Sequence, residues 1–268
     1  MDYKLLALDL DDTLLNEKFR ISPRNAEALK EAARQGIGVT LATGRMFRSS
    51  LPFARELNIG LPLITYHGAL IKESTGEGKV LSKWSVPRDL ALEILHYGEG
   101  EGFHFNIYLD DKLYVGEENE HSRYYQSIAS IPLETVGNLG SFLEKTGEEP
   151  TKLTVIDRLG RLEGLQKVLL EKYASDLSIL QSRPFFLEIT HREATKGRAL
   201  KFLAEREGLS SSQVIAIGDS YNDVDMLQYA GVGVAMGNAP PDVKKAADFV
   251  AMTNVEDGVA RFLENYIL

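Results

Sequence analysis

Short apolar runs alternate with amphipathic stretches in the first third of the chain. Three strands are expected at residues 3–10, 37–42 and 63–66, and two helices at 23–35 and 47–57. Ser22 followed by Pro23 is typical of a helix N-terminus. Strands that alternate with helices in this way predict parallel pairing with right-handed crossovers.

The last third of the chain repeats this rhythm. Strands are expected at 214–218, 232–235 and 249–251, and helices at 196–206, 222–229, 241–246 and 259–266. The strands are almost continuously apolar, which is typical of a sheet that helices cover on both faces. The two thirds together predict an α/β fold with a Rossmann-like parallel-sheet core.

The middle third has a different pattern. The sequence LDDK at Leu109–Lys112 lies between two apolar runs and is a hairpin signal. Strands are expected at 103–108, 113–115, 152–156, 177–180 and 185–189, and helices at 90–97 and 162–172. We therefore expect an α+β cap domain of residues 82–190, inserted into a discontinuous catalytic core of residues 1–81 and 191–268.

The composition narrows the function classes. The chain has 268 residues, of which 44% are hydrophobic and 26% charged, as in an ordinary globular enzyme. It has no cysteine, which excludes disulfides, thiolate zinc sites and cysteine nucleophiles. No apolar run approaches the roughly 20 residues that span a bilayer, and no secretory signal is evident. We expect a cytoplasmic enzyme without a membrane partner; the sequence is silent on oligomeric state.

The net charge of −9 also bears on partners. No run of Lys and Arg follows the pattern that tracks a phosphate backbone, so a nucleic-acid partner is not expected. An acidic protein that handles an anionic substrate must concentrate positive charge locally, through a few basic side chains or a metal ion.

The first segment with candidate chemistry is DLDDT, Asp9–Thr13. Asp9 lies inside an apolar run, and carboxylates are rarely buried unless a cation pairs with them. Asp9 and Asp11 are two residues apart, so on an extended chain they project to the same side. The alternative is a strand end capped by turn-forming aspartates.

Two further segments carry candidate anion-binding groups. Thr43, Gly44 and Arg45 offer a hydroxyl, a flexible backbone and a guanidinium at a strand end, although TGR is also an ordinary turn. Lys196 would lie in the first turn of a helix, where the helix dipole disfavours a cation. A bound anion would explain the lysine there; a solvated side chain is the alternative.

The fourth segment is IGDSYND, Ile217–Asp223, directly after an apolar strand. Ligands of open α/β sheets bind outside the carboxyl ends of the strands, so the four segments are expected to converge. The oxygen ligands expected for Mg²⁺ are Asp9, Asp11 and Asp219, with Asp223 nearby. The donors expected for a phosphoryl group are Thr43, Lys196 and Asn222. One carboxylate can then attack phosphorus while another handles the leaving-group proton.

The motifs DLDDTLL, ATGR, the KG before a helix and GDSYNDVDML occur in this order, with the large insert between the second and third. In this the chain resembles the haloacid dehalogenase-like hydrolase superfamily, and most closely its Cof-type phosphatases. The resemblance implies a Mg²⁺-dependent phosphomonoester hydrolase that acts on small phosphorylated metabolites, with sugar phosphates favoured, through an aspartyl-phosphate intermediate.

The resemblance also implies a role for each matching residue. Asp9 would be the nucleophile and Asp11 the acid and base. Mg²⁺ would be held by the Asp9 carboxylate, the Asp11 backbone carbonyl and Asp219. Asp223 would support the metal or the lysine.

The same resemblance assigns the phosphoryl-binding groups. Thr43 would hold the phosphoryl oxygens, with help from Asn222. Lys196 would neutralise developing charge and orient the nucleophile, and Arg45 would lie near the substrate.

The chain departs from the family pattern at two positions. Asp12 stands where a glycine commonly follows the second aspartate, and His67 stands where relatives usually carry an asparagine before the glycine. His67 is either an exposed replacement or a change that faces the substrate. The other four histidines form no spaced metal pair.

Three alternative functions remain open at this point. A phosphomutase would use the same nucleophile and metal but return the phosphoryl group to the sugar. A non-enzymatic phosphoacceptor switch also combines acidic residues with Thr and Lys, but such domains are about half this length. A pure binding or scaffold protein would leave all four motifs without a purpose.

Overall fold

The computed structural model describes residues 3–76, 78–129 and 131–268. The chain divides into two compact units. The first unit comprises Met1–Ser82 and Thr195–Leu268, and the second unit comprises Lys83–Ala194. For comparison, the insertion expected from the sequence spans residues 82–190.

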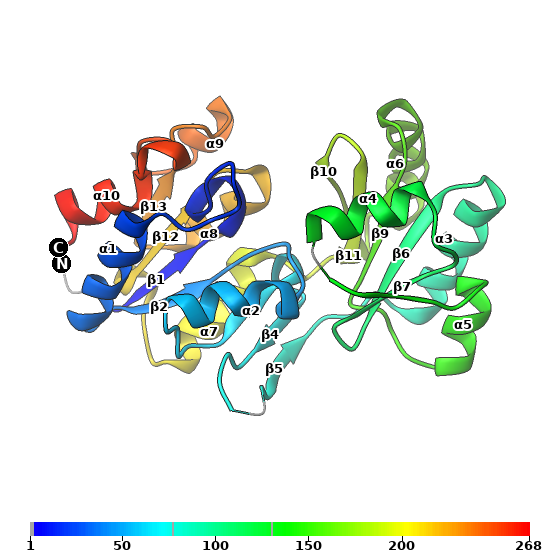
Figure 1. Ribbon diagram of the computed structural model, residues 1–268, viewed down its shortest axis with the longest axis horizontal. Helices are drawn as coiled ribbons and strands as arrows, with labels where there is room; N and C mark the ends of the chain where they lie inside the picture. The colour runs from blue at the N-terminus through cyan, green and yellow to red at the C-terminus, as the bar shows by residue number, and fades with distance from the viewer. Residues whose placement is uncertain (1–2, 77, 130) are drawn as a thin grey trace. The chain divides into compact units, whose positions relative to one another are not determined.

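The first unit is built on a sheet of five parallel strands in the order β14-β13-β12-β1-β2 (Figure 1). These strands are β1 (Leu5–Leu8), β2 (Gly38–Leu41), β12 (Val214–Gly218), β13 (Val232–Ala235) and β14 (Phe249–Val250). All residues of β1 are fully buried, because this central strand has a neighbour on each side. The near-continuous apolar runs of β1 and β12 thus match a sheet whose two faces are both covered.

Among the described residues of the first unit, six α-helices accompany this sheet. They are α1 (Pro23–Arg34), α2 (Phe47–Glu56), α7 (Lys196–Arg206), α8 (Val224–Tyr229), α9 (Pro241–Lys245) and α10 (Gly258–Tyr266). Helix α1 packs against α10, and α7 packs against α8. Ser22 caps α1 as expected, because its Oγ accepts a hydrogen bond from the Asn25 N–H at 3.1 Å.

A smaller sheet of the first unit has the order β3-β4-β5. Its strands are β3 (Leu63–Thr65), β4 (Leu70–Lys72) and β5 (Val80–Lys83). The parallel pairing expected for residues 63–66 appears as a bridge between Ala42 and Ile64. The ladder of β3 is instead antiparallel to β4, because the chain reverses at the short turn η2 (Tyr66–Gly68).

The second unit contains a sheet of six strands in the order β10-β11-β9-β6-β7-β8. They are β6 (His104–Leu109), β7 (Lys112–Val115), β8 (Leu133–Thr135), β9 (Lys152–Ile156), β10 (Leu177–Arg183) and β11 (Phe186–His191). The strands pair antiparallel except β7 with β8, which pair parallel. The α-helices of this unit are α3 (Arg88–Gly100), α4 (Glu120–Ala129), α5 (Leu139–Thr146) and α6 (Leu159–Tyr173).

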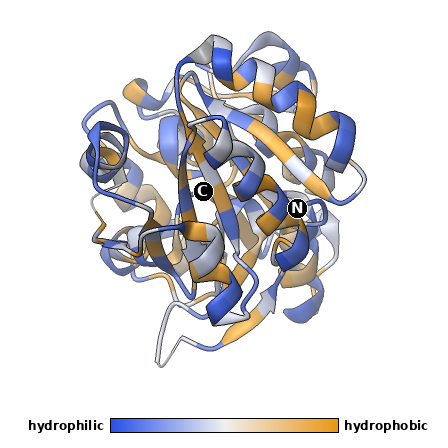
Figure 2. Ribbon diagram, turned by 90° about the vertical axis from the view of Figure 1, so that its right-hand side faces the viewer, coloured by the Kyte–Doolittle hydropathy of each residue, from blue (hydrophilic) through white to orange (hydrophobic). Residues whose placement is uncertain are grey.

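The apolar core of the second unit lies between one face of its sheet and the helices α3, α5 and α6. The helices in Figure 2 carry both hydrophobic and hydrophilic residues. The LDDK hairpin is present: Asp110 and Asp111 form the turn between β6 and β7, with φ of 45° and 58°. Such left-handed pairs are typical of two-residue hairpin turns. Among the described helices of both units, none is both long and apolar enough to cross a membrane.

Candidate active site

Three chemistry-bearing segments follow three adjacent strands of the parallel sheet. Asp9 follows β1 directly, Asp219 follows β12, and Thr43 lies two residues after β2. The carboxyl ends of parallel neighbours lie at one edge of the sheet, so the fold brings these segments together there. Helix α7 begins with Lys196, which completes the group.

Lys196 lies between two carboxylates in the buried centre of this site. Its Nζ donates to Asp9 Oδ1 at 2.6 Å and to Asp223 Oδ1 at 2.5 Å. The three residues are 1%, 6% and 0% exposed respectively. The alternative of a solvated lysine is therefore wrong.

The charges of this cluster depend on one another. Burial opposes the charge of Lys196, but the carboxylates of Asp223 and Asp9 raise its pKa above the ordinary value, so it stays protonated. Burial also raises the pKa of Asp9 well above its usual range, while Lys196 lowers it and the neighbouring aspartates raise it further. Asp9 is held in an environment where its negative charge needs a cation.

Asp223 is oriented by the backbone of its own segment. Its Oδ2 accepts hydrogen bonds from the N–H groups of Asp219 at 3.0 Å and Ser220 at 2.9 Å. A Cβ at Gly218 would lie 2.5 Å from Asp223 Cγ, so only glycine leaves room for this carboxylate. The sequence GDSYND therefore specifies both the turn and the position of its last aspartate.

Asp219 has a hydroxyl group as its partner, whereas Asp9 and Asp223 contact Lys196. The Asp219 Oδ1 accepts a hydrogen bond from the Thr13 hydroxyl at 2.7 Å. Burial, with the nearby charge of Asp223, raises the pKa of Asp219 to about 7. At neutral pH this carboxyl group is poised between its two protonation states unless a cation joins it.

The carboxylates of Asp9, Asp219 and Asp223 each offer one oxygen, and these oxygens all lie within 4.8 Å of one another. Three ionised carboxylates and one Lys196 ammonium would leave two uncompensated negative charges. Hard oxygen donors with this excess charge are what Mg²⁺ prefers, with water and substrate oxygens completing its shell. The donor set therefore fits a divalent cation.

The side chain of Asp11 is not part of this cluster. Arg45 donates to it through two hydrogen bonds, Nε to Oδ2 at 2.7 Å and Nη2 to Oδ1 at 2.6 Å. The guanidinium lies 5.9 Å from the Phe19 ring centroid and 5.4 Å from that of Phe53. The sequence predicted that Asp11 and Arg45 belong to one site, but it did not predict that they contact each other.

The turn after β2 brings Thr43 and Gly44 to the same edge of the sheet. Thr43 is fully buried, and its Oγ1 accepts a hydrogen bond from the Arg45 N–H at 3.2 Å. Gly44 lies against the ring of His67, whose Cε1 would be 2.3 Å from a Cβ at residue 44. The turn is therefore closely packed and cannot accept a side chain at Gly44 without displacing the histidine.

His67 also contacts Asn222, the remaining predicted phosphoryl-binding residue. The Asn222 Nδ2 lies 2.9 Å from His67 Nδ1. His67 is 9% exposed, so its interpretation as an exposed replacement is wrong. The sequence feature that could have predicted a buried His67 is its position before Gly68, in the turn that follows strand β3.

Two residues that sequence reasoning left without a role also organise the site. Thr13 donates to Asp219, as described above, and Asp225 accepts a hydrogen bond from the Gly197 N–H at 2.9 Å. The second contact ties the first turn of α7, next to Lys196, to α8. Both residues lie within the motif segments, but their partners are far away in the sequence.

Known proteins resemble this chain in sequence and in fold. The family model described as haloacid dehalogenase-like hydrolase matches residues 6–263. The chain belongs to this family. The resemblance drawn from the motifs is thereby confirmed, as is the prediction of a hydrolytic enzyme.

Individual relatives of the haloacid dehalogenase-like family match over nearly the full chain. The phosphatase YwpJ of Bacillus subtilis is 31% identical over 286 residues, which cover 98% of this chain and 100% of that protein. A solved haloacid dehalogenase-like hydrolase from Bacteroides thetaiotaomicron has a TM-score of 0.89 at 31% identity, and 98% of each chain is covered. A solved sugar phosphatase of subclass IIB has a TM-score of 0.84 at 27% identity, again with 98% of each chain covered.

The structure explains how this family member accommodates Asp12. The residue has φ 60° and ψ 7°, in the left-handed region that glycine adopts most readily. Aspartate and asparagine are enriched among the other residues found there. The Asp12 carbonyl also accepts a hydrogen bond from Asn238 Nδ2 at 2.8 Å, which holds the turn.

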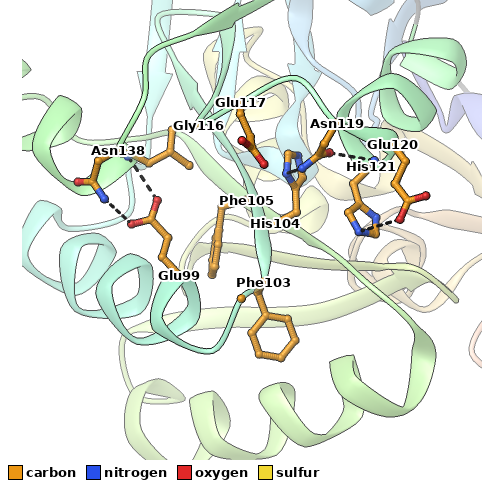
Figure 3. A pocket seen from close by; sticks show the side chains of 12 residues that line it. Glu99, Phe103, His104, Phe105, Gly116, Glu117, Asn119, Glu120, His121 and Asn138 are labelled. Atoms are coloured by element: carbon orange, nitrogen blue, oxygen red, sulfur yellow. Dashed lines mark hydrogen bonds and ion pairs between the residues drawn. The ribbon is translucent and has the colours of Figure 1, made fainter.

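A hollow of about 470 Å³ lies within the second unit, and none of its described lining residues belongs to these motifs (Figure 3). Three glutamates line it, Glu99, Glu117 and Glu120, and no Lys or Arg is among its described lining residues. The ring of His104 is held there by Asn106 and Asn119, each at 3.1 Å. An acidic lining would repel a phosphate dianion.

Proposed function

We propose that the protein is a Mg²⁺-dependent phosphomonoester hydrolase that works through an aspartyl-phosphate on Asp9. The observation that carries the proposal is the buried Lys196, which binds both Asp9 and Asp223 beside Asp219. A scaffold protein has no use for this arrangement, because burying several charged groups costs free energy of folding. A nucleophile held by a lysine at a cation site is what phosphoryl transfer requires.

In the first step, an Asp9 carboxylate oxygen attacks phosphorus. Lys196 holds Oδ1, so we assign the attack to Oδ2. The bond between phosphorus and the ester oxygen breaks, and the leaving alkoxide takes a proton from the carboxyl group of Asp11. The products are the free alcohol and the aspartyl-phosphate, so the proton and the phosphoryl group are both accounted for.

In the second step, Asp11 takes a proton from water, and the resulting hydroxide attacks phosphorus. The bond to the Asp9 oxygen breaks, which releases inorganic phosphate and restores the Asp9 carboxylate. In both steps, the Asp11 carboxyl group must release its two hydrogen bonds from Arg45 and contact the reacting oxygen instead. Arg45 would then be available to bind the substrate, as the family resemblance implies.

The phosphoryl group needs donors, since its oxygens only accept hydrogen bonds. We assign this role to the Thr43 hydroxyl, the Gly44 backbone and the Asn222 amide, with Lys196 adding charge. Asp9, Asp219 and Asp223 would hold Mg²⁺, with the Asp11 carbonyl as a further ligand. The ion supplies positive charge that offsets the charge of the phosphoryl group.

The substrate class we propose is small phosphorylated metabolites, with sugar phosphates favoured. Support comes from the sugar phosphatase that shares this fold at 27% identity. All the catalytic residues lie in the first unit, so we assign residues 1–81 and 191–268 as the catalytic core. Residues 82–190 are assigned as the cap that selects the substrate, and a cytoplasmic location stays a prediction.

Phosphate release from p-nitrophenyl phosphate tests the proposal. We expect release by the wild type that requires Mg²⁺, and loss of at least about 10³-fold in Asp9→Asn, because the amide cannot form the acyl-phosphate. The matched control is Asp12→Asn, which makes the same chemical change at an exposed neighbour and should retain most activity.

Release that persists in Asp9→Asn would contradict the covalent mechanism. A wild type that releases little phosphate but transfers it between sugar positions, with a sugar bisphosphate primer, would indicate a phosphomutase instead.

A further inference from the structure

The ring of His67 is fitted into the turn that carries Thr43. The His67 N–H donates to the Thr43 carbonyl at 3.0 Å. A Cβ at Gly44 would lie between 2.3 and 2.9 Å from three atoms of the imidazole, Cε1, Nε2 and Nδ1. The absence of a side chain at Gly44 thus creates the space that the ring fills, directly beside the proposed phosphoryl-binding turn.

The backbone that presents His67 is strained. Tyr66, His67 and Gly68 have successive φ values of 53°, 58° and 102°. Side chains with a Cβ rarely adopt this left-handed region, and a non-glycine pair there persists only where its surroundings fix it. Gly68 is itself fixed, because a Cβ there would lie 2.2 Å from the Thr195 carbonyl oxygen. The turn is therefore held between the Thr43 segment and the residue that precedes Lys196.

The imidazole contacts Asn222, one of the proposed phosphoryl-binding residues. Its Nδ1 lies 2.9 Å from the Asn222 Nδ2, an arrangement in which the amide donates to the ring. In this orientation the Asn222 Oδ1 is buried and finds no hydrogen-bond partner among the described residues. A buried acceptor without a donor is costly, and its neighbour would be an anion that also only accepts.

Rotating the Asn222 amide by 180° gives Oδ1 a donor and turns the amide nitrogen toward the expected anion. The oxygen and nitrogen of an asparagine have nearly the same shape, and their assignment follows from the hydrogen bonds around them. After rotation, Asn222 Oδ1 accepts from a protonated His67 Nδ1. The amide nitrogen then occupies the position of the unpartnered oxygen and offers its N–H groups to an acceptor.

We propose that His67 is a positioning residue that orients the Asn222 amide toward the phosphoryl group. In the phosphate-bound protein the neutral imidazole carries its proton on Nδ1 and donates it to Asn222 Oδ1. The inference rests on the proposed function, in which Asn222 donates to the phosphoryl oxygens. It gives this chain's departure from the family pattern at residue 67 a specific role.

A double-mutant cycle tests whether His67 acts through Asn222. The variants are His67→Ala, Asn222→Ala and the two combined, assayed with p-nitrophenyl phosphate and Mg²⁺. We expect each single variant to lower kcat/KM by about 10- to 100-fold, and the double variant to be no worse than Asn222→Ala. Losses that multiply in the double variant would overturn the proposal, because the two residues would then act independently.

Conservative variants separate positioning from packing. Asparagine places a polar atom at nearly the same position as the histidine Nδ1 and adopts the left-handed region readily. Leucine has a similar size but no polar atom. We expect His67→Asn to stay within about threefold of the wild type while His67→Leu loses as much as His67→Ala. Equal activity of the asparagine and leucine variants would overturn the proposal. Thermal unfolding of each variant checks that both are folded.

The tautomer gives a readout that does not depend on turnover. Long-range ¹H–¹⁵N spectra of histidine-labelled protein, with Mg²⁺ and inorganic phosphate at pH 8, report which ring nitrogen carries the proton. The signal that disappears in His67→Asn identifies the residue. We expect protonation at Nδ1 with phosphate bound, and protonation at Nε2 would overturn the proposal. Failure of the proposed function would show separately, as a wild type that releases no phosphate from any ester.

Discussion

Asp9 and Asp11 lie two residues apart, but their carboxylates meet different cations. Asp9 is buried against the ammonium of Lys196, whereas Asp11 is partly exposed and receives two hydrogen bonds from Arg45. Pairs of acids in different environments are how one site supplies both a nucleophile and an acid. The two aspartates therefore have different partners, and in the proposed mechanism Asp11 must leave Arg45 before it can act as the acid.

Removal of the buried ammonium should destabilise the protein as well as inactivate it. In Lys196→Met a side chain of similar length replaces the cation between Asp9 and Asp223, which leaves two carboxylates buried without it. We expect the free energy of unfolding of the metal-free protein to fall by about 3–5 kcal/mol, measured by chemical denaturation.

The control for this variant is Lys201→Met on the same helix. Lys201 is exposed and lies 3.8 Å from Glu205, so its loss should change the stability by less than about 1 kcal/mol. Equal effects at the two positions would show that the buried ammonium has no special role.

At the scale of elements, the apolar strands and their polar endings were readable from the sequence. Strands β1 and β12 were predicted because their residues are almost all apolar, and the candidate residues were found because each follows such a strand. Helices α4 and α5 were missed. Helix α4, EHSRYYQSIA, is largely polar, and α5 has only eight residues, although Asn138 and Gly147 are ordinary signals for its ends.

The sequence predicted which residues belong to the site better than it predicted the contacts between them. Nothing in the sequence indicates that Arg45 binds Asp11, that Thr13 binds Asp219, or that the ring of His67 fits over Gly44. These contacts depend on how the turns after neighbouring strands are oriented, which local patterns do not specify.

The geometry of the turn after β12 is tightly specified. In Gly218→Ala the added methyl group would overlap the carboxylate of Asp223, which must then move away from Lys196. We expect a loss of stability of about 1–3 kcal/mol and weaker binding of Mg²⁺, measured by thermal unfolding with and without the ion.

Gly60→Ala is the matched control for this substitution. A Cβ at Gly60 meets nothing within 4 Å, so this variant should keep its Mg²⁺ response and its stability. A normal Mg²⁺ response in Gly218→Ala would contradict the assigned position of Asp223.

At the scale of the whole molecule, we expect the acidic site to make stability depend on pH, and on Mg²⁺ where the ion binds as proposed. The pKa of Asp219 is raised to about 7 and that of Asp9 is raised as well. Between about pH 4, the ordinary value of an aspartate, and pH 7, the folded protein binds protons that the unfolded chain has released. The free energy of unfolding of the metal-free protein therefore falls as the pH rises through this window.

At the proposed metal site, Mg²⁺ would compete with these protons for the same oxygens, so we expect its stabilising effect to grow as the pH rises. We expect the increase in Tm caused by Mg²⁺ to be small at pH 5 and larger at pH 8, measured against protein in EDTA. Asp219→Asn should flatten the pH dependence of the metal-free protein and reduce the shift. An equal shift at both pH values would contradict this assignment of the protons.

The central position of β1 has a consequence for how the chain is made. Its neighbour β2 begins at Gly38, but its other neighbour, β12, begins only at Val214. A growing chain on the ribosome therefore holds one fully apolar strand edge open until about four fifths of the protein has emerged. Long-range pairings of this kind fold slowly and expose strand edges to other chains. We therefore expect the long sequence separation between β1 and β12 to expose the nascent chain to aggregation.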